Sequence, residues 1–290
     1  MNIQTIDVAR RGAAAALLLV GLAGCATPDR SSGQAVLSPE RVAAILSAPD
    51  RSVADRVNDQ RRKPEQMLAF IGVRPGMAAL DISAGGGYTT ELLARAIGPG
   101  GIVYGQSPPR NVAAPAPAAP EGNSSPAPAS TASPTPRRTS PEALADRESR
   151  LKAGGAAAAP IIAVVQAFED PVPPGRASQG LDLATLMFNY HDLGFLGVDR
   201  AQMNRAVFAA LKPGASYVIA DHAGRPGTGI SESGTLHRIE EAFLIREVEA
   251  AGFKLAAEAA FLRNLADPRD RNTPEPAQPK DEFVLKFVRP

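Results

Sequence analysis

The stretch from Ala78 to Thr90 constrains the fold of this chain more than any other part of its sequence. An apolar run, Met77 to Ile82, leads into three consecutive glycines, Gly85 to Gly87, and a helical pattern of apolar residues follows at once. Strand, glycine turn and helix in this order place a bare backbone and a helix N-terminus at the edge of a parallel sheet. Only glycine lets a ligand approach the main chain so closely, so the turn predicts a crevice for an adenosine-containing or phosphorylated ligand. A tight turn without a ligand is the alternative.

The same stretch resembles the first motif of the class I S-adenosylmethionine-dependent methyltransferases, in which an acid and a hydrophobic residue precede Gly-x-Gly-x-Gly. Gly85 and Gly87 match two of the motif glycines, and Ser83 stands where the first one is usual. The residues from Arg62 to Met77 resemble the lead-in helix and turn of that family. The resemblance implies S-adenosylmethionine as the cofactor.

Two further segments are similar to a group of predicted bacterial methyltransferases: residues 189–192, Asn-Tyr-His-Asp, and residues 263–264, Arg-Asn. With them the resemblance covers most of residues 53–107 and 141–290. It implies an α/β fold with a doubly wound, mostly parallel seven-stranded sheet, the Rossmann-like methyltransferase fold, and an antiparallel C-terminal strand. Alternating strands and helices followed by a terminal strand pair favour the same architecture.

The other elements follow from apolar periodicity and from helix start and stop signals. The charged run 51–63 is either a solvated helix face or a segment that lines the cofactor cleft. Helices are predicted from Ser38 and over residues 140–152, 200–211 and 238–251. Strands are predicted over residues 101–104, 161–165, 181–188, 217–221, 253–261 and 282–288.

Residues 1–24 have the pattern of a bacterial lipoprotein signal peptide. Arg10 and Arg11 precede an apolar run, Gly12 to Gly24, that is shorter than the ~20 residues needed to span a bilayer. Leu22-Ala23-Gly24-Cys25 resembles a lipobox, whose cysteine is acylated, and Cys25 is the only cysteine in the chain. The sequence therefore predicts a lipid anchor at Cys25 that holds the protein on a membrane of the bacterial cell envelope. Ala26 after the cysteine favours the periplasmic side of the outer membrane, and an ordinary signal peptide with a chance cysteine is the alternative.

After the signal peptide we expect a polar tether, residues 25–37, and then one methyltransferase-like domain, residues 38–290. The domain is interrupted at 108–139 by a segment rich in proline, alanine and serine. Ten of the 27 prolines fall between Pro108 and Pro141. Such a segment cannot bury enough apolar surface to offset its ordering entropy, so we predict a disordered insertion.

Open α/β sheets bind ligands beyond the carboxyl ends of their strands. The resemblance implies that Asp81 interacts with the amino-acid part of the cofactor. A carboxylate is expected after the second strand to accept from the ribose hydroxyls, but Gln106 and Ser107 stand there, and neutral acceptors are weaker. Either of Glu169 and Asp170 accepts from the adenine amino group, or the two lie in a solvated turn. The predicted cofactor-binding residues are Asp81, Ser83, Gly85, Gly87, Gln106, Ser107, Glu169, Asp170 and Asn189.

The predicted catalytic residues follow the strand 181–188, where the transferred methyl group would lie. His191 is a candidate general base because an unperturbed imidazole titrates near neutrality, and Asp192 is a candidate to orient it. Tyr190 is the third candidate. A capping turn, in which Asn189 and Asp192 bond to backbone groups, is the alternative.

Other classes of site and function are less well supported by the sequence. Net charge is +1 and tryptophan is absent, so a nucleic-acid partner is not expected. No metal is predicted, because His191, His222 and Asp221 lack the HExxH spacing. An NAD enzyme would need an acid about 20 residues after the glycines, where Gln106 and Ser107 stand, so this class of enzyme is also disfavoured.

These observations favour an S-adenosylmethionine-dependent methyltransferase with a small-molecule acceptor. S-adenosylmethionine is not known to be supplied outside the cytoplasm, where the predicted anchor would place the domain. The alternative is therefore a non-catalytic envelope lipoprotein that retains the fold and binds another ligand.

Overall fold

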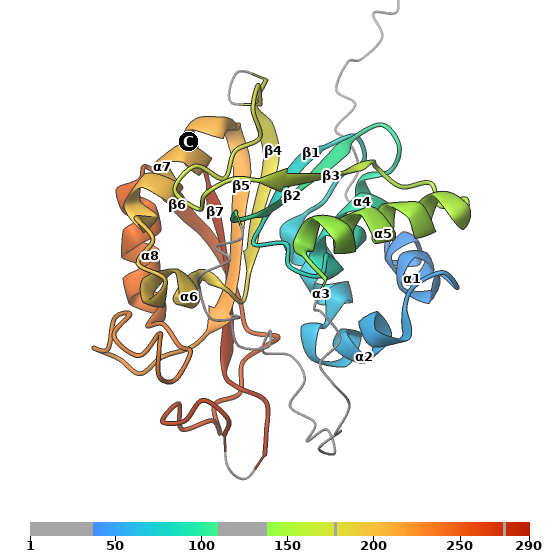
Figure 1. Ribbon diagram of the computed structural model, residues 1–290. Helices are drawn as coiled ribbons and strands as arrows, with labels where there is room; N and C mark the ends of the chain where they lie inside the picture. The colour runs from blue at the N-terminus through green and yellow to red at the C-terminus, as the bar shows by residue number, and fades with distance from the viewer. Residues whose placement is uncertain (1–36, 110–137, 177–178, 275–276) are drawn as a thin grey trace, which may run out of the picture. The chain divides into compact units, whose positions relative to one another are not determined.

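The computed structural model describes residues 37–109, 138–176, 179–274 and 277–290 (Figure 1). These residues belong to one structural unit, Gln34–Pro290. The predicted signal peptide, Cys25, all but the last residue of the tether, and residues 110–137 of the predicted insertion lie outside the described residues. Among the described helices none is long and apolar enough to cross a membrane.

A seven-stranded sheet forms the centre of the fold, in the order β3-β2-β1-β4-β5-β7-β6. Strand β7 is antiparallel to both of its neighbours, and the pairs among β1 to β5 are parallel. This confirms the predicted doubly wound, mostly parallel sheet with an antiparallel C-terminal strand. The strands are β1 (Ala78–Ile82), β2 (Ile102–Ser107), β3 (Ile161–Val165), β4 (Leu181–Met187), β5 (Leu211–His222), β6 (Lys254–Ala259) and β7 (Glu282–Val288).

Helices cover both faces of this sheet (Figure 1). One core cluster packs α1, α3, α4 and α5 against one face, and another packs α6, α7 and α8 against the opposite face. Because both faces are covered, β1 is buried at every residue, Asp81 included, as its mostly apolar run predicts. The helices are α1 (Pro39–Ser47), α2 (Val53–Arg62), α3 (Pro64–Ile71), α4 (Tyr88–Ile97), α5 (Ser140–Ala153), α6 (Tyr190–Phe195), α7 (Arg200–Ala210) and α8 (Glu241–Ala250).

The strand order reverses between β1 and β4, because β1 is followed by β2 on one side and has β4 on the other. A ligand crevice is expected at such a switch point, outside the carboxyl ends of the two strands. In Figure 1 these ends point to the lower edge of the view, where α2 and α6 lie. The glycine turn 85–87, between β1 and α4, therefore reaches the edge where the sequence predicts a ligand.

Several predicted boundaries differ from the structure, and three of the differences have a clear structural reason. Helix α5 is capped by Thr139, which forms a capping box with Glu142, so the predicted insertion, residues 108–139, extends at least one residue too far. The helix predicted over 238–251 begins only at Glu241, because Ile239 forms a parallel bridge with Ala223. Strand β5 begins at Leu211, six residues before the predicted strand 217–221, and pairs there with Leu181.

Candidate functional site

The glycine turn presents an open backbone at two of its three residues. Gly85 and Gly86 are exposed, whereas Gly87 is buried. A Cβ at Gly86 would meet nothing within 4 Å, but a Cβ at Gly87 would lie 2.6 Å from Leu144 and 2.8 Å from Arg147. Gly87 is therefore required by packing and by its left-handed φ of 78°, and the Gly85–Gly86 backbone is what a ligand would meet.

Ser83, which replaces the usual first glycine, also has a left-handed backbone, with φ of 57°. This region favours glycine, which accounts for the residue expected at that position in the motif. The Ser83 hydroxyl donates to the side-chain oxygen of Asn189, which follows β4. The contact ties the start of the glycine turn to the end of the neighbouring strand.

Arg147 of α5 fastens the turn to two other helices. Its guanidinium donates to the carbonyl of Gly86, to Asp55 of α2 at 2.7 and 2.8 Å, and to Glu91 of α4 at 2.6 Å. Burial tends to raise the pKa of Asp55, but Arg147 outweighs it and the pKa is lowered. Buried carboxylates with a bidentate arginine between them hold α2 and α5 in place against the turn.

Helix α2, the predicted charged run, makes a second contact with the same region. The Tyr88 hydroxyl donates to Asp59 at 2.7 Å, and Arg51 pairs with both oxygens of Asp59 at 2.6 and 2.7 Å. The inner face of α2 is thus paired with the glycine turn rather than solvated along its whole length.

Asp81 is buried inside β1, with 2% of its surface exposed. It accepts hydrogen bonds from the hydroxyls of Thr90 at 2.6 Å and of Thr185 at 2.7 Å. Burial raises the pKa of Asp81 to about 6, against the opposing effect of the two hydroxyls. A positively charged group beside this carboxyl would favour its ionised form.

Gln106 does not have a free amide for a ribose. Its Oε1 accepts from the backbone N–H of Ser83 at 3.0 Å, and its Nε2 donates to the carbonyl of Gln166 at 2.7 Å. The side chain is fully buried and cross-links the segments that follow β1, β2 and β3. The prediction that Gln106 binds the cofactor is therefore wrong for its side chain, and of the predicted pair Ser107 is left.

The two acids after β3 are engaged elsewhere or exposed. Glu169 accepts from the backbone N–H of Asp199, before α7, at 3.4 Å. Asp170 is exposed. Their predicted contact with adenine stays a prediction.

Tyr190 does not face the ligand edge. It is fully buried, and its hydroxyl accepts from Asn204 of α7 at 2.8 Å and donates to Glu247 of α8 at 3.1 Å. The side chain belongs to the core between these helices, so its predicted catalytic role is wrong.

Asn189 and Asp192 are bonded to side chains and not in a capping turn. Asn189 precedes α6 without a side-chain capping bond. Its Nδ2 donates to Asp192 Oδ2, while its Oδ1 accepts from Ser83. Asn189 therefore connects the glycine turn to Asp192, which the sequence had placed in the same site.

His191 is held by Asp221 at the end of β5. Its Nδ1 lies 2.6 Å from Asp221 Oδ1 and its backbone N–H donates to Oδ2 at 2.7 Å. Burial alone would lower the pKa of His191, but Asp221 and Asp192 raise it to about 10. Asp221 orients the ring through Nδ1, and Asp192 Oδ1 lies 3.1 Å from Nε2, so both acids contact the imidazole. The role of His191 as a general base stays a prediction.

All three histidines of the chain gather at this edge. The ring of His191 lies 5.3 Å from that of His222 and 5.6 Å from that of His237, between centroids. His237 Nδ1 is 3.1 Å from Asp192 Oδ1. His237 was not among the predicted site residues, and the low number of histidines in the chain was the only signal in the sequence that could have pointed to it.

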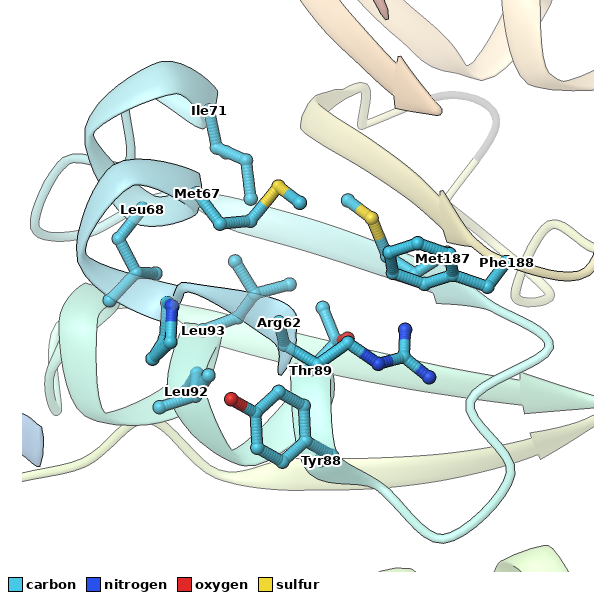
Figure 2. Close-up of a pocket in the computed structure, with 11 residues that line it drawn as sticks. Arg62, Met67, Leu68, Ile71, Tyr88, Thr89, Leu92, Leu93, Met187 and Phe188 are labelled. Atoms are coloured by element: carbon cyan, nitrogen blue, oxygen red, sulfur yellow. The ribbon is translucent and has the colours of Figure 1, made fainter. Parts of the chain in front are cut away.

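An apolar cavity of about 20 Å³ lies beside the glycine turn, between α3, α4 and the end of β4 (Figure 2). The guanidinium of Arg62 lies over the ring of Phe188, 3.9 Å from its centroid. A cavity of this size holds about one water molecule. A nucleoside would therefore lie on the open turn and not in the cavity. The lining residues are Arg62, Pro64, Met67, Leu68, Ile71, Tyr88, Thr89, Leu92, Leu93, Met187 and Phe188.

No protein-family model matches the chain, and no curated protein sequence is significantly similar to it. Among solved structures it is similar to an arsenic(III) S-adenosylmethionine methyltransferase from Chlamydomonas reinhardtii. The two share 16% identity and a TM-score of 0.50 over 87% of this chain and 74% of that one. The chain has the methyltransferase fold. At this identity the similarity concerns the fold alone.

Two more solved structures are similar to the chain. One is a SAM-dependent methyltransferase from Aquifex aeolicus, with 16% identity and a TM-score of 0.49 over 88% of this chain and 100% of that one. The other is a putative sarcosine dimethylglycine methyltransferase from Galdieria sulphuraria, with 13% identity and a TM-score of 0.48 over 81% and 85%.

Proposed function

We propose that this protein is an S-adenosylmethionine-dependent methyltransferase that acts on a small-molecule acceptor. The observation that carries the proposal is the open Gly85–Gly86 backbone, which follows a buried strand at the switch point of a methyltransferase-fold sheet. Because glycine has no side chain, the space beside these two residues stays open, and a ligand can lie against the main chain there. Asp81, near the end of β1, is buried and bonded to Thr90 and Thr185, so its carboxyl would act on the ammonium end of the cofactor from inside the strand and not by direct contact.

The remaining contacts are assigned from what each side chain has free. Ser107 is the residue proposed for the ribose, since both ends of the Gln106 amide are bonded within the protein. When bound, the cofactor supplies an electrophilic methyl group. The chain's own task is to bind and orient the two reactants, which alone can contribute a large part of the acceleration.

His191 and Asp192 fit a role in orienting the acceptor better than one in removing a proton. His191 has 1% of its surface exposed and its Nδ1 is engaged by Asp221 at 2.6 Å, so it is poorly placed to take a proton from an acceptor. Asp192 has 26% of its side chain exposed and can accept a hydrogen bond from an incoming molecule. We therefore propose an acceptor whose nucleophilic atom carries no proton that must be removed for the methyl group to be transferred.

Equilibrium binding tests the proposal. Wild-type protein is titrated with S-adenosylmethionine and S-adenosylhomocysteine by calorimetry, beside the variants Gly86→Val and Gly100→Val. Both glycines are exposed, and a Cβ at Gly100 meets only Gly76 at 4.0 Å, before β2 at the opposite end of the strands. We expect Gly86→Val to lose binding while Gly100→Val keeps it, with circular dichroism showing that both fold. Equal binding by the two variants would mean that the ligand lies elsewhere.

A second candidate function is favoured by the Gln106 arrangement. A neutral, fully bonded side chain stands near the position where a ribose-binding carboxylate is expected, which suits a protein that keeps the fold and binds another ligand without catalysis. Wild type that binds neither nucleoside at millimolar concentration would support this candidate against the enzyme.

We also propose that the domain is anchored by lipid at Cys25 to a membrane of the bacterial cell envelope, on the periplasmic side of the outer membrane. Support comes from the Leu22–Cys25 sequence behind a short apolar run. Expression of Cys25→Ser should leave an unprocessed precursor. An unchanged mature mass and an unchanged membrane fraction would rule out the anchor.

A further inference from the structure

We propose that His191, Asp192 and His237 form a binding site for one divalent transition-metal ion of the first row. The three residues come from two separate places in the chain, the start of α6 and the segment between β5 and α8. The proposal concerns metal binding alone and does not depend on whether the protein binds S-adenosylmethionine.

The distances among the three donor atoms suit a single ion. One possible ligand atom from each of His191, Asp192 and His237 lies within 4.8 Å of the other two. Asp192 Oδ1 is 3.1 Å from both His191 Nε2 and His237 Nδ1. Ligands bound at about 2.0–2.2 Å from one ion lie about 3 Å apart when they occupy adjacent positions, so little movement is needed.

The Nε2 atom of His191, the proposed ligand atom, has no hydrogen bond in the structure. This nitrogen is enclosed, and the nearby Asp192 oxygen does not meet hydrogen-bond geometry despite the short distance. Most buried polar side-chain atoms have a hydrogen-bond partner, so the lack of one at Nε2 is unusual and requires an explanation. A metal ion between the three residues would take its lone pair.

Outer contacts hold two of the proposed ligands in the required orientation. Asp221 Oδ1 lies 2.6 Å from His191 Nδ1, which fixes that nitrogen as the protonated one and leaves Nε2 for the metal. Asn189 donates to Asp192 Oδ2 and leaves Oδ1 for the metal. A carboxylate behind a ligating histidine is the usual outer arrangement of such sites.

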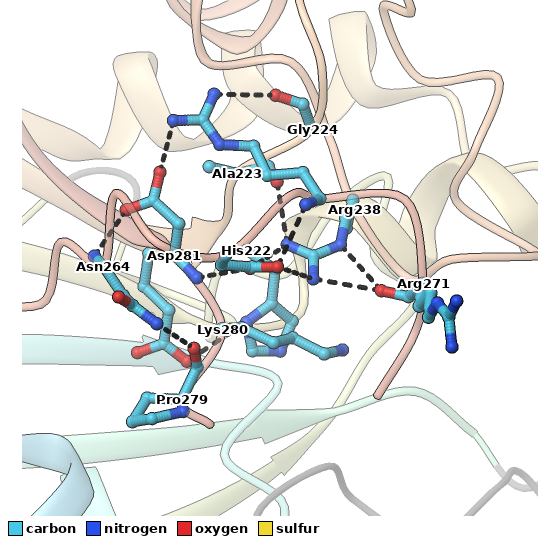
Figure 3. Close-up of polar contacts among 12 residues, drawn as sticks. His222, Ala223, Gly224, Arg238, Asn264, Arg271, Pro279, Lys280 and Asp281 are labelled. Atoms are coloured by element: carbon cyan, nitrogen blue, oxygen red, sulfur yellow. Dashed lines mark hydrogen bonds and ion pairs between the residues drawn. The ribbon is translucent and has the colours of Figure 1, made fainter. Parts of the chain in front are cut away.

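The third ligand is held through the residue after it. Arg238 is fully buried and pairs with Asp267 at 2.9 Å. It also donates to the carbonyls of Ala223 at 3.0 Å and of Arg271 at 3.0 Å (Figure 3). This fixes the backbone of His237, whose φ is a left-handed 51°. The rigid placement of a residue with such a backbone favours a binding role for its side chain.

The donor set indicates the class of ion. Two imidazoles and one carboxylate suit zinc, iron, cobalt, nickel or manganese, whereas magnesium and calcium prefer oxygen ligands throughout. The side chains of Asp192 and His237 are 26% and 22% exposed, so the ion would be reached from solvent and would keep open positions. His222 is not part of the set, since its Nδ1 lies 3.1 Å from Glu282.

Metal titration of the full mature chain tests the site. Protein treated with a chelator is titrated with Zn²⁺ by calorimetry, and with Co²⁺ to record its visible absorption. We expect one equivalent to bind wild type, and His237→Asn and Asp192→Asn each to weaken binding by at least tenfold. Asparagine tolerates the left-handed backbone of His237 and so should keep the fold. Glu258→Gln, an exposed acid on β6, is the matched control and should bind as wild type does.

The proposal has two ways to fail. Wild type that binds no Zn²⁺ at 100-fold excess over micromolar protein would overturn it. Binding of one equivalent that is unchanged in both His237→Asn and Asp192→Asn would overturn it as well, because the ion would then lie elsewhere. Magnesium, added at the same concentrations, should not compete.

Discussion

The carboxylate of Asp221 holds His191 by both of its oxygens, one on the ring nitrogen at 2.6 Å and one on the backbone N–H at 2.7 Å. Both residues are at most 1% exposed. The pair joins the end of β5 to the start of α6, so it fixes the position of the segment that carries Asp192. A buried charge pair of this kind is costly to break from one side only.

Removal of both partners should therefore destabilise the domain by less than the sum of the two single removals. His191→Ala leaves a buried carboxylate without its imidazole and should lower the free energy of unfolding by about 3–5 kcal/mol. Asp221→Asn should lower it for the same reason. Because the double variant leaves no unpaired charge, its loss should be smaller than the sum of the two.

Urea denaturation of the four proteins measures this coupling. A double variant whose loss equals the sum of the single losses to within about 0.5 kcal/mol would mean that the two residues do not interact. The result also bears on kinetics, since a variant of His191 that unfolds cannot be used to test its role in turnover.

Gly87 should be required for stability and Gly86 should not. Gly87→Ala places a Cβ against Leu144 and Arg147 and forces alanine into a left-handed backbone, which alone costs about 1–3 kcal/mol. Gly86→Ala meets open space and should change the free energy of unfolding by no more than about 0.5 kcal/mol. Thermal and urea unfolding of both variants give the comparison, and equal stabilities would show that α5 does not pack on the turn.

A carboxylate at residue 106 should harm the fold and not improve binding. In Gln106→Glu the donor to the Gln166 carbonyl is lost and a charge is buried, which should cost at least about 1–3 kcal/mol. The affinity for S-adenosylmethionine should not rise, because the side chain is directed into the protein. Tighter cofactor binding by a stable Gln106→Glu variant would restore the original ribose assignment.

The doubly wound, mostly parallel sheet could be predicted because local pattern and fold agree at β1. The pattern there is a mostly apolar run with one acid, Asp81, then three glycines and an apolar helix face. The left-handed backbones of Ser83 and Gly87 belong to the turn that this pattern predicts. The direction of individual side chains after β4 could not be predicted. Tyr190 and His191 are neighbours at the start of α6, so they point about 100° apart, one into the core and one to the ligand edge.

The partners of His191 were also beyond the reach of sequence. Asp192 is next to it in the chain, but Asp221, 30 residues away, makes the hydrogen bond. His237 comes to the same place only because Ile239, two residues later, pairs with Ala223, the residue directly after β5. Contacts of this kind depend on tertiary structure and leave no periodic signal.

The last prediction concerns the pH dependence that Asp81 confers. Its pKa is raised by burial from 3.8 to about 6, so the folded protein binds this proton more tightly than the unfolded chain does. The stability that protonation of Asp81 contributes is therefore present at low pH and is lost as pH rises from about 4 to about 6. Asp81→Asn removes this dependence, because an amide stays neutral.

The free energy of unfolding of Asp81→Asn minus that of wild type should thus increase between pH 4 and pH 7. The increase should be on the order of 3 kcal/mol, from 1.36 kcal/mol for each pKa unit. Other titrating groups shift both proteins alike, so the difference isolates Asp81. Urea unfolding at several pH values measures it. Parallel profiles would mean that Asp81 ionises normally in the folded protein, and the carboxyl would then have no unusual tendency to lose its proton when a cationic ligand binds beside it.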